Sequence, residues 1–202
     1  MKTFTASRTS FCFMSVRSGR KQKGSMSEGV FRDQIIRYGD YRKKIYNGIT
    51  VSFESFLESN MAYVRVQSGV FMGNGWEDCN LFGMELSDVL SEMDRFVRCS
   101  MGGVRLKRAE LDQSGFRECT CTGSIWEQAV LKGCSFTGCN FRGAYFEKAV
   151  MKKTRFLNCA FDGVCMTGVS MSQVLFQNCV FTGTGPALPG GCRLKGCVYK
   201  EQ

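Results

Sequence analysis

Large apolar residues recur at every fifth position along most of the chain. From Val51 to Phe181 every fifth residue is large and apolar, apart from Ser91 and Cys121. Neither an α-helix, with a period of 3.6, nor a flat strand, with a period of 2, produces this spacing. The residue two positions before each of these centres is usually small. The pattern therefore predicts a unit of five residues with one large and one small inward residue.

A second period of twenty residues lies on top of the first. Cysteine recurs at this spacing from Cys79 to Cys179, and an aromatic residue recurs from Phe56 to Phe176. Twenty residues are four units, so the chain completes a four-sided coil on which the next coil stacks, as in a solenoid. The predicted core ladder consists of Phe96, Phe116, Phe136, Phe156, Phe176, Cys99, Cys119, Cys139, Cys159 and Cys179.

Several units resemble the repeat of the pentapeptide-repeat family, which is written A(D/N)LxX with Leu or Phe at its centre. They include CNFRG (139–143), AYFEK (144–148), CAFDG (159–163) and AELDQ (109–113). The resemblance covers roughly residues 49–183 and implies an all-β fold, a right-handed quadrilateral β-helix of about seven 20-residue coils. This chain departs from the family by preferring Cys to Ala in the small position on one face, and Phe or Met to Leu at many centres.

The sequence divides into four segments. Residues 1–29 form a basic tail rich in Ser and Thr, and residues 49–183 form the repeats. In residues 30–48 the near-helical spacing of Phe31, Ile35, Ile36 and Tyr41 predicts a short amphipathic helix that closes one end of the rod. Residues 184–202 read as a Pro/Gly loop and two units out of phase, CRLKG and CVYKE, which cap the other end. If they leave that end exposed, the resemblance implies a homodimer through it.

Composition argues against catalysis and against a metal or cofactor site. The chain has no histidine, which removes the usual general base and the commonest metal ligand. We therefore expect no catalytic residue, no cofactor and no metal ligand. The twelve cysteines have two interpretations: small buried thiols, or a zinc site for which no CxxC pair exists. Coils spaced at ~4.8 Å hold side chains too far apart for a disulfide, which favours reduced thiols.

One coil carries polar residues at inward positions. Ser91 occupies a centre, and Asp94 occupies the small position of the next unit. The structural interpretation is a locally distorted coil in which both groups meet backbone donors. The alternative is a catalytic role, for which the sequence offers no base.

The outward positions suggest a docking surface. Ile125, Tyr145 and Cys165 fall in one column at twenty-residue spacing, and Val130 and Val150 fall in the next. Scattered apolar surface residues are ordinary, but five in neighbouring columns would form a protein-binding patch.

The basic N-terminal tail has several interpretations. Residues 1–27 contain six Lys/Arg and no acid, in a chain of net charge +9 whose residues 69–183 are neutral. The tail reads as a solvated disordered segment, an uncleaved export signal of the bacterial type III kind, or an organellar transit peptide. It also permits peripheral contact with an anionic membrane. The sequence predicts no transmembrane segment and no signal peptide. On the export interpretation of the tail, we expect a protein that is made in the bacterial cytoplasm and secreted into a host cell.

Three functions follow from these features. The first is a non-enzymatic, protein-binding protein like the bacterial secreted effectors involved in virulence, which docks a protein partner on the outer face of the rod. The second is a topoisomerase-protecting resistance factor; the resemblance implies a strongly acidic, DNA-like rod for such proteins, which the neutral rod and net positive charge disfavour. The third is a scaffold or the substrate-binding module of a larger effector. Direct nucleic-acid binding is not expected.

Overall fold

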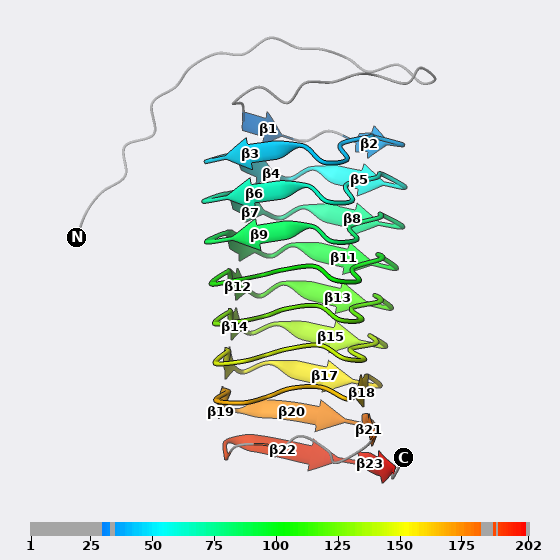
Figure 1. Ribbon diagram of the computed structural model, residues 1–202, viewed down its shortest axis with the longest axis vertical. Helices are drawn as coiled ribbons and strands as arrows, with labels where there is room; N and C mark the ends of the chain where they lie inside the picture. Colours follow the sequence, from blue (N-terminus) through cyan, green and yellow to red (C-terminus); the bar gives the residue numbers. More distant parts are fainter. Residues whose placement is uncertain (1–29, 33–34, 183–187, 189, 201–202) are drawn as a thin grey trace, which may run out of the picture.

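The chain forms a rod of stacked, four-sided coils. The computed structural model describes residues 30–32, 35–182, 188 and 190–200. In these residues the fold is an all-β parallel solenoid of about eight turns, and the coils stack along the long axis from β1 to β23 (Figure 1). The predicted β-solenoid is confirmed. The basic tail and most of the Pro/Gly loop lie outside the described residues.

Short parallel strands build the two best-formed faces. The first face is a sheet of eight strands: β1 (Val30–Arg32), β4 (Thr50–Ser52), β7 (Val70–Met72), β10 (Leu90–Glu92), β12 (Glu110–Asp112), β14 (Val130–Lys132), β16 (Val150–Lys152) and β19 (Ser170–Ser172). The second face is a sheet of nine: β2 (Ile35–Arg37), β5 (Ser55–Leu57), β8 (Gly75–Glu77), β11 (Arg95–Val97), β13 (Gly115–Arg117), β15 (Ser135–Thr137), β17 (Arg155–Leu157), β20 (Val174–Gln177) and β22 (Cys192–Lys195).

The other two faces combine strands with single bridges. The third face has isolated bridges from Asp40 to Ala160 and then β18 (Ala160–Asp162), β21 (Val180–Thr182) and β23 (Val198–Lys200). The fourth face begins with β3 (Ile45–Asn47), β6 (Arg65–Gln67) and β9 (Glu85–Ser87) and continues as bridges to Cys165. Before the last described coil the register is twenty residues on every face, for example Phe116↔Phe136, which is why the sequence repeats at that interval.

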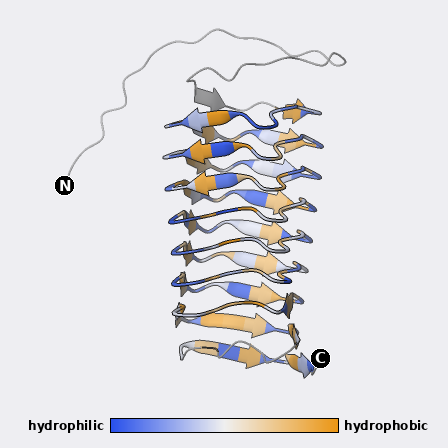
Figure 2. Ribbon diagram, viewed as in Figure 1, coloured by the Kyte–Doolittle hydropathy of each residue, from blue (hydrophilic) through white to orange (hydrophobic). Residues whose placement is uncertain are grey.

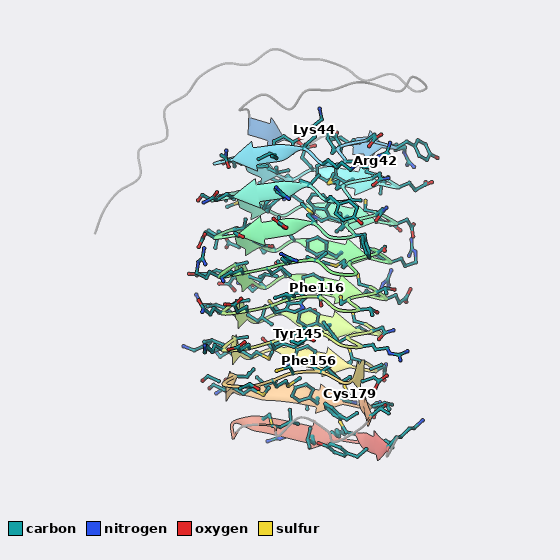
Figure 3. All side chains as sticks on the ribbon, viewed as in Figure 1. Arg42, Lys44, Phe116, Tyr145, Phe156 and Cys179 are labelled. Atoms are coloured by element: carbon teal, nitrogen blue, oxygen red, sulfur yellow. The ribbon has the colours of Figure 1, made fainter. Side chains whose placement is uncertain are left out.

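Aromatic rings fill the interior beneath the second face. Phe116 and Phe136 stack with ring centroids 4.6 Å apart, and Phe136 and Phe156 at 4.8 Å, with their planes nearly parallel (Figure 3). These spacings match the ~4.8 Å separation of neighbouring strands. Figure 2 shows apolar residues recurring along the strands, most continuously in β20. The coil spacing thus sets the stacking distance of the rings.

Each corner uses a left-handed backbone conformation. The residue two positions after a centre has a positive φ, as at Glu58 (50°) and Gly83 (63°). Non-glycine residues occupy many of these corners at a cost of roughly 1–2 kcal/mol each. The hydrogen bonds of the stacked coils offset that cost, because every strand inside the stack pairs on both sides.

The helix predicted for residues 30–48 is wrong for the described part of that range. These residues form β1, β2 and β3, which pair with the coil below, and Ile36 and Tyr41 pack against the core. The five-residue phase in fact extends upstream, since Ile36, Tyr41 and Tyr46 continue the series that includes Val51. Lys44, at a position that is usually small, obscured the phase.

The last described coil is shorter than the others. Phe176 pairs with Leu194 and Phe181 with Tyr199, an offset of eighteen residues rather than twenty. Tyr199 stacks on Phe181 at 5.1 Å but remains 52% exposed, and Leu194 is 43% exposed. The two out-of-phase units therefore extend the stack, and their own outer side is open in the described residues.

Candidate functional site

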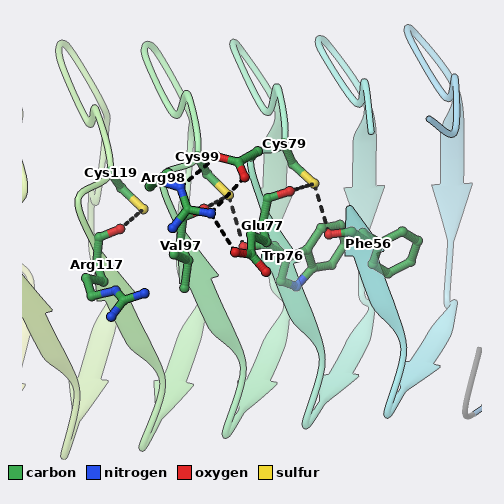
Figure 4. Close-up of polar contacts among 10 residues, drawn as sticks. Phe56, Trp76, Glu77, Cys79, Val97, Arg98, Cys99, Arg117 and Cys119 are labelled. Carbon is green, nitrogen blue, oxygen red and sulfur yellow. Dashed lines mark hydrogen bonds and ion pairs between the residues drawn. The ribbon is translucent and has the colours of Figure 1, made fainter. Parts of the chain in front are cut away.

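A column of thiols runs along the inside of the third face. Each Cys Sγ donates to the carbonyl two residues earlier and to a carbonyl of the coil above, as Cys99 does to Val97 (3.4 Å) and Trp76 (3.3 Å) (Figure 4). Ser59 occupies the same position and donates to Leu57. The position therefore favours a small hydrogen-bond donor, which explains why Cys replaces Ala there. The core-ladder cysteines that follow this rule are Cys99, Cys119, Cys139, Cys159 and Cys179.

The described cysteines are free thiols, and most of them are buried. All eleven described cysteines carry free thiols, and eight of them are buried. Burial raises the pKa of Cys134, a thiol behind the second face, to about 12, which disfavours the nucleophilic thiolate of that residue. In the third-face column, hydrogen bonds with neighbouring cysteines lower the pKa of the Cys79 and Cys179 thiols. Among the described residues no group of three or more Cys, Asp or Glu side chains could hold a metal ion.

Ser91 and Asp94 belong to a buried polar ladder in a regular coil. The strand at Ser91 keeps full register with both neighbours, so the expected distortion of this coil is absent. Ser91 Oγ donates to Asp94 Oδ2 at 2.6 Å, and the backbone and side-chain amides of Asn74 donate to Asp94 Oδ1 at 2.8 and 2.9 Å. The Asp94 amide donates to Ser114 Oγ at 3.2 Å. The twenty-residue spacing of 54, 74, 94 and 114 could have identified this ladder from sequence.

The ladder is electrostatically unusual. Asp94 has no exposed surface, and burial raises the pKa of its carboxyl to about 6. A cavity of about 20 Å³ lies beside it, lined largely by apolar side chains such as Trp76 and Phe96, and is large enough for one water molecule. The residues that line this cavity belong to the core of neighbouring coils.

The structure divides the predicted patch between two faces. Ile125, Tyr145 and Cys165 pair in one column on the fourth face, where Tyr145 is 53% exposed and the other two are half-buried (Figure 3). Val130 and Val150 pair on the first face and are half-buried. The structure thus brings together the members of each column, while a corner separates the two columns.

The sequence analysis missed a group of exposed aromatic residues in the upper coils. Phe53 lies over Gly73, and Tyr63 lies over Gly83; a Cβ at either glycine would meet the ring within about 2.8 Å. Phe82 contacts Tyr63 edge-on at 5.6 Å between centroids. All three aromatic residues are at least 45% exposed. They occupy outward positions, so the twenty-residue frame could have revealed them.

Charge is also unevenly distributed along the rod. Residues 69–128 carry six Lys/Arg and ten Asp/Glu, whereas residues 129–182 carry six and two. The repeats of residues 69–182, which are neutral together, therefore divide into an acidic first part and a basic second part. Several exposed charges form ion pairs between neighbouring coils, such as Arg98 with Asp78 (2.8 Å) and Arg108 with Asp88 (2.6 Å). No helix capable of crossing a membrane occurs in the residues that the structure describes.

The comparisons agree with this architecture. The family model for pentapeptide repeats matches residues 114–152 and 139–178 with eight copies. No curated protein matches the chain.

Solved structures show distant similarity. HetL, a pentapeptide repeat protein involved in heterocyst differentiation regulation in Nostoc sp. strain PCC 7120, is 12% identical over 83% of this chain and 86% of its own, with a TM-score of 0.49. QnrB1, a plasmid-mediated fluoroquinolone resistance protein, is 15% identical over 85% and 92%, with a TM-score of 0.41. A pentapeptide repeat protein of the Arabidopsis thaliana thylakoid lumen is 22% identical over 48% and 70%, with a TM-score of 0.37. At these values no shared function follows from the similarity.

Proposed function

Because the chain belongs to the pentapeptide-repeat family, we propose that it is a non-enzymatic binding protein that docks a protein partner on the outer surface of its rod. The observation that carries this proposal is the apolar column on the fourth face. Ile125, Tyr145 and Cys165 lie in register in three successive coils, and Tyr145 exposes half of its side chain. Exposed tyrosines beside smaller apolar groups are typical of protein-binding surfaces.

Mixed charges surround this column. Arg105 precedes Ile125 in the same column, and the neighbouring outward positions carry Glu127, Glu147 and Lys148. An apolar centre with a charged rim is the usual arrangement at a protein interface. Val130 and Val150, beyond the corner on the first face, would belong to a second contact surface rather than to this one.

A paired-variant capture experiment tests the docking surface. We expect a partner protein captured by the native chain to be lost with Ile125→Asp, Tyr145→Asp. The matched control is Thr120→Asp, Ser135→Asp, which places the same charge on exposed positions of the third and second faces. A Val130→Asp, Val150→Asp variant tests the other column. If the native chain and the fourth-face variant bind the same proteins equally, the proposed surface is wrong.

The finer biological proposal is a bacterial secreted-effector role. On this proposal the chain is made in the bacterial cytoplasm and its basic, Ser/Thr-rich residues 1–29 direct export into a host cell, where they also permit contact with an anionic membrane. Deletion of residues 1–27 should then abolish export without changing capture of the partner. Unchanged export of the deletion variant would refute the effector role and leave the docking surface untouched.

Two alternatives have their own discriminating tests. A topoisomerase-protecting role is disfavoured because the repeat segment 69–183 is neutral and the chain has a net charge of +9; relief of inhibitor-blocked gyrase supercoiling would support it. A scaffold or substrate-binding module would bind its partner without export.

The exposed last coil favours a homodimer through the C-terminal end of the rod, which Tyr199→Asp should dissociate.

A further inference from the structure

The first face carries a column of charges in an unusual order. Glu92, Asp112, Lys132 and Lys152 lie in register in four successive coils, one position after each centre. The side chains of the two lysines are exposed and those of the two acids are half-buried. Read along the rod, the column is acid, acid, base, base.

This order places like charges beside each other twice. Glu92 pairs in register with Asp112, and Lys132 pairs with Lys152. Like charges directly opposite on neighbouring strands destabilise a sheet. The fourth face shows the arrangement that a single rod favours, because Arg65, Glu85 and Arg105 alternate there and Glu85 pairs with both arginines at 3.3 and 3.8 Å. In the first-face column, by contrast, only one of the three in-register neighbour pairs, Asp112 with Lys132, joins opposite charges within one copy of the chain.

A two-fold rotation sets each charge of this column against an opposite charge. When two rods pack antiparallel through this face, with the axis between the coils of Asp112 and Lys132, each column faces itself in reverse order. Glu92 then faces Lys152 of the second copy, and Asp112 faces Lys132 of the second copy. The reciprocal contacts double these pairs to four.

One apolar pair of the same face follows the same symmetry. In the column that precedes the centres, Leu90 is 41% exposed and lies three coils from the half-buried Val150. The same rotation sets Leu90 against Val150 of the second copy and Glu110 against Val130 of the second copy. Lys132 already pairs with Glu110 at 3.4 Å, so its ammonium would lie between that carboxylate and Asp112 of the second copy.

We propose that the first face is a self-complementary interface through which two copies of this chain associate as antiparallel rods. The occupant of the face is a second copy, because the charge order complements itself and no other partner is needed to account for it. This interface lies on the side of the rod and is separate from the fourth-face column and from the C-terminal end.

The size of the face sets the strength of the association. Six coils at ~4.8 Å and a strand width of about 10 Å give roughly 300 Å² per copy, well below the ~800 Å² per partner of a standard stable interface. The dimer should therefore be weak, should depend on protein concentration, and should dissociate as salt screens its four exposed pairs.

Charge swapping across the face tests the proposal with the full chain. Sedimentation velocity at low ionic strength over a range of protein concentrations should show a monomer–dimer equilibrium for the native chain. The equilibrium should persist in Tyr199→Asp, which removes the separately proposed contact at the C-terminal end, and the charge variants are measured in that background. Glu92→Lys, Asp112→Lys makes the column wholly basic, and Lys132→Glu, Lys152→Glu makes it wholly acidic. Each variant alone should raise the dissociation constant at least about tenfold.

Mixing the two variants provides the decisive measurement. The basic and acidic columns complement each other, so an equimolar mixture should dimerise at least as well as the native chain, which also shows that both variants are folded. Glu58→Lys, Glu118→Lys is the matched control, since it makes the same charge change at exposed corners between the second and third faces. The proposal would be overturned if the native chain were monomeric, or if each variant by itself dimerised as well as the native chain. It would also be overturned if the mixture of the two variants failed to dimerise.

Discussion

Replacement of Asp94 by Asn should stabilise the protein at neutral pH and remove a pH dependence. Asp94 is fully buried, and its carboxyl accepts from two Asn74 donors and from Ser91. An asparagine can keep both bonds from Asn74 through Oδ1, and its amide can donate to Ser91 Oγ, whose hydroxyl hydrogen is then free to turn toward Ser114 Oγ 3.3 Å away. The substitution therefore changes charge with little change in shape.

The magnitude follows from the pKa of Asp94. Burial raises the pKa from 3.8 to about 6, a difference of about two units, which corresponds to about 3 kcal/mol. Because the folded state binds the proton more tightly, stability is highest below the unfolded pKa and falls as the pH rises from about 4 through about 6. The Asn variant does not titrate, so it should match the native chain near pH 4 and exceed its stability by up to about 3 kcal/mol near pH 8.

Urea unfolding followed by far-ultraviolet circular dichroism at both pH values measures this difference. The control is Glu118→Gln, which neutralises an exposed corner carboxylate and should change stability little at either pH. The reasoning would be refuted if Asp94→Asn were less stable than the native chain at pH 8, or if it kept the native pH dependence.

Three further substitutions test how the coils pack. Phe136→Ala removes a fully buried ring from the stacked column and should cost about 3–5 kcal/mol in urea unfolding; a loss below 1 kcal/mol would contradict the continuous ladder. Gly83→Ala should lower the melting temperature more than Gly103→Ala, because both have φ of +63° but only Gly83 lies beneath the Tyr63 ring; equal losses would show that the ring moves aside freely. Cys139→Ser should be tolerated better than Cys139→Val in thermal unfolding, since only Ser keeps the donor to the Thr137 and Phe116 carbonyls; the reverse order would mean that apolar packing outweighs these bonds.

The comparison of sequence and structure shows where the repeat was informative and where it was obscured. A strict period of five held over many coils admits few folds, and the period of twenty placed Phe116 beneath Phe96 and above Phe136 as the structure shows. The period of five residues also extends upstream of Val51. Tyr41 and Tyr46 continue the phase, but Lys44, at a position that is usually small, made the segment resemble an amphipathic helix.

The sequence by itself determined the four-sided coil, the inward and outward positions, and the register, because each depends only on counting along the chain. Tertiary structure decided how much of each outward side chain is exposed and what the buried polar groups contact. Ser91 and Asp94 were evident as exceptions, but their bonds to Asn74 and Ser114 required atomic positions in three coils. Periodicity fixes the direction of a side chain, whereas hydrogen bonding and exposure depend on distances that only the stacked coils set.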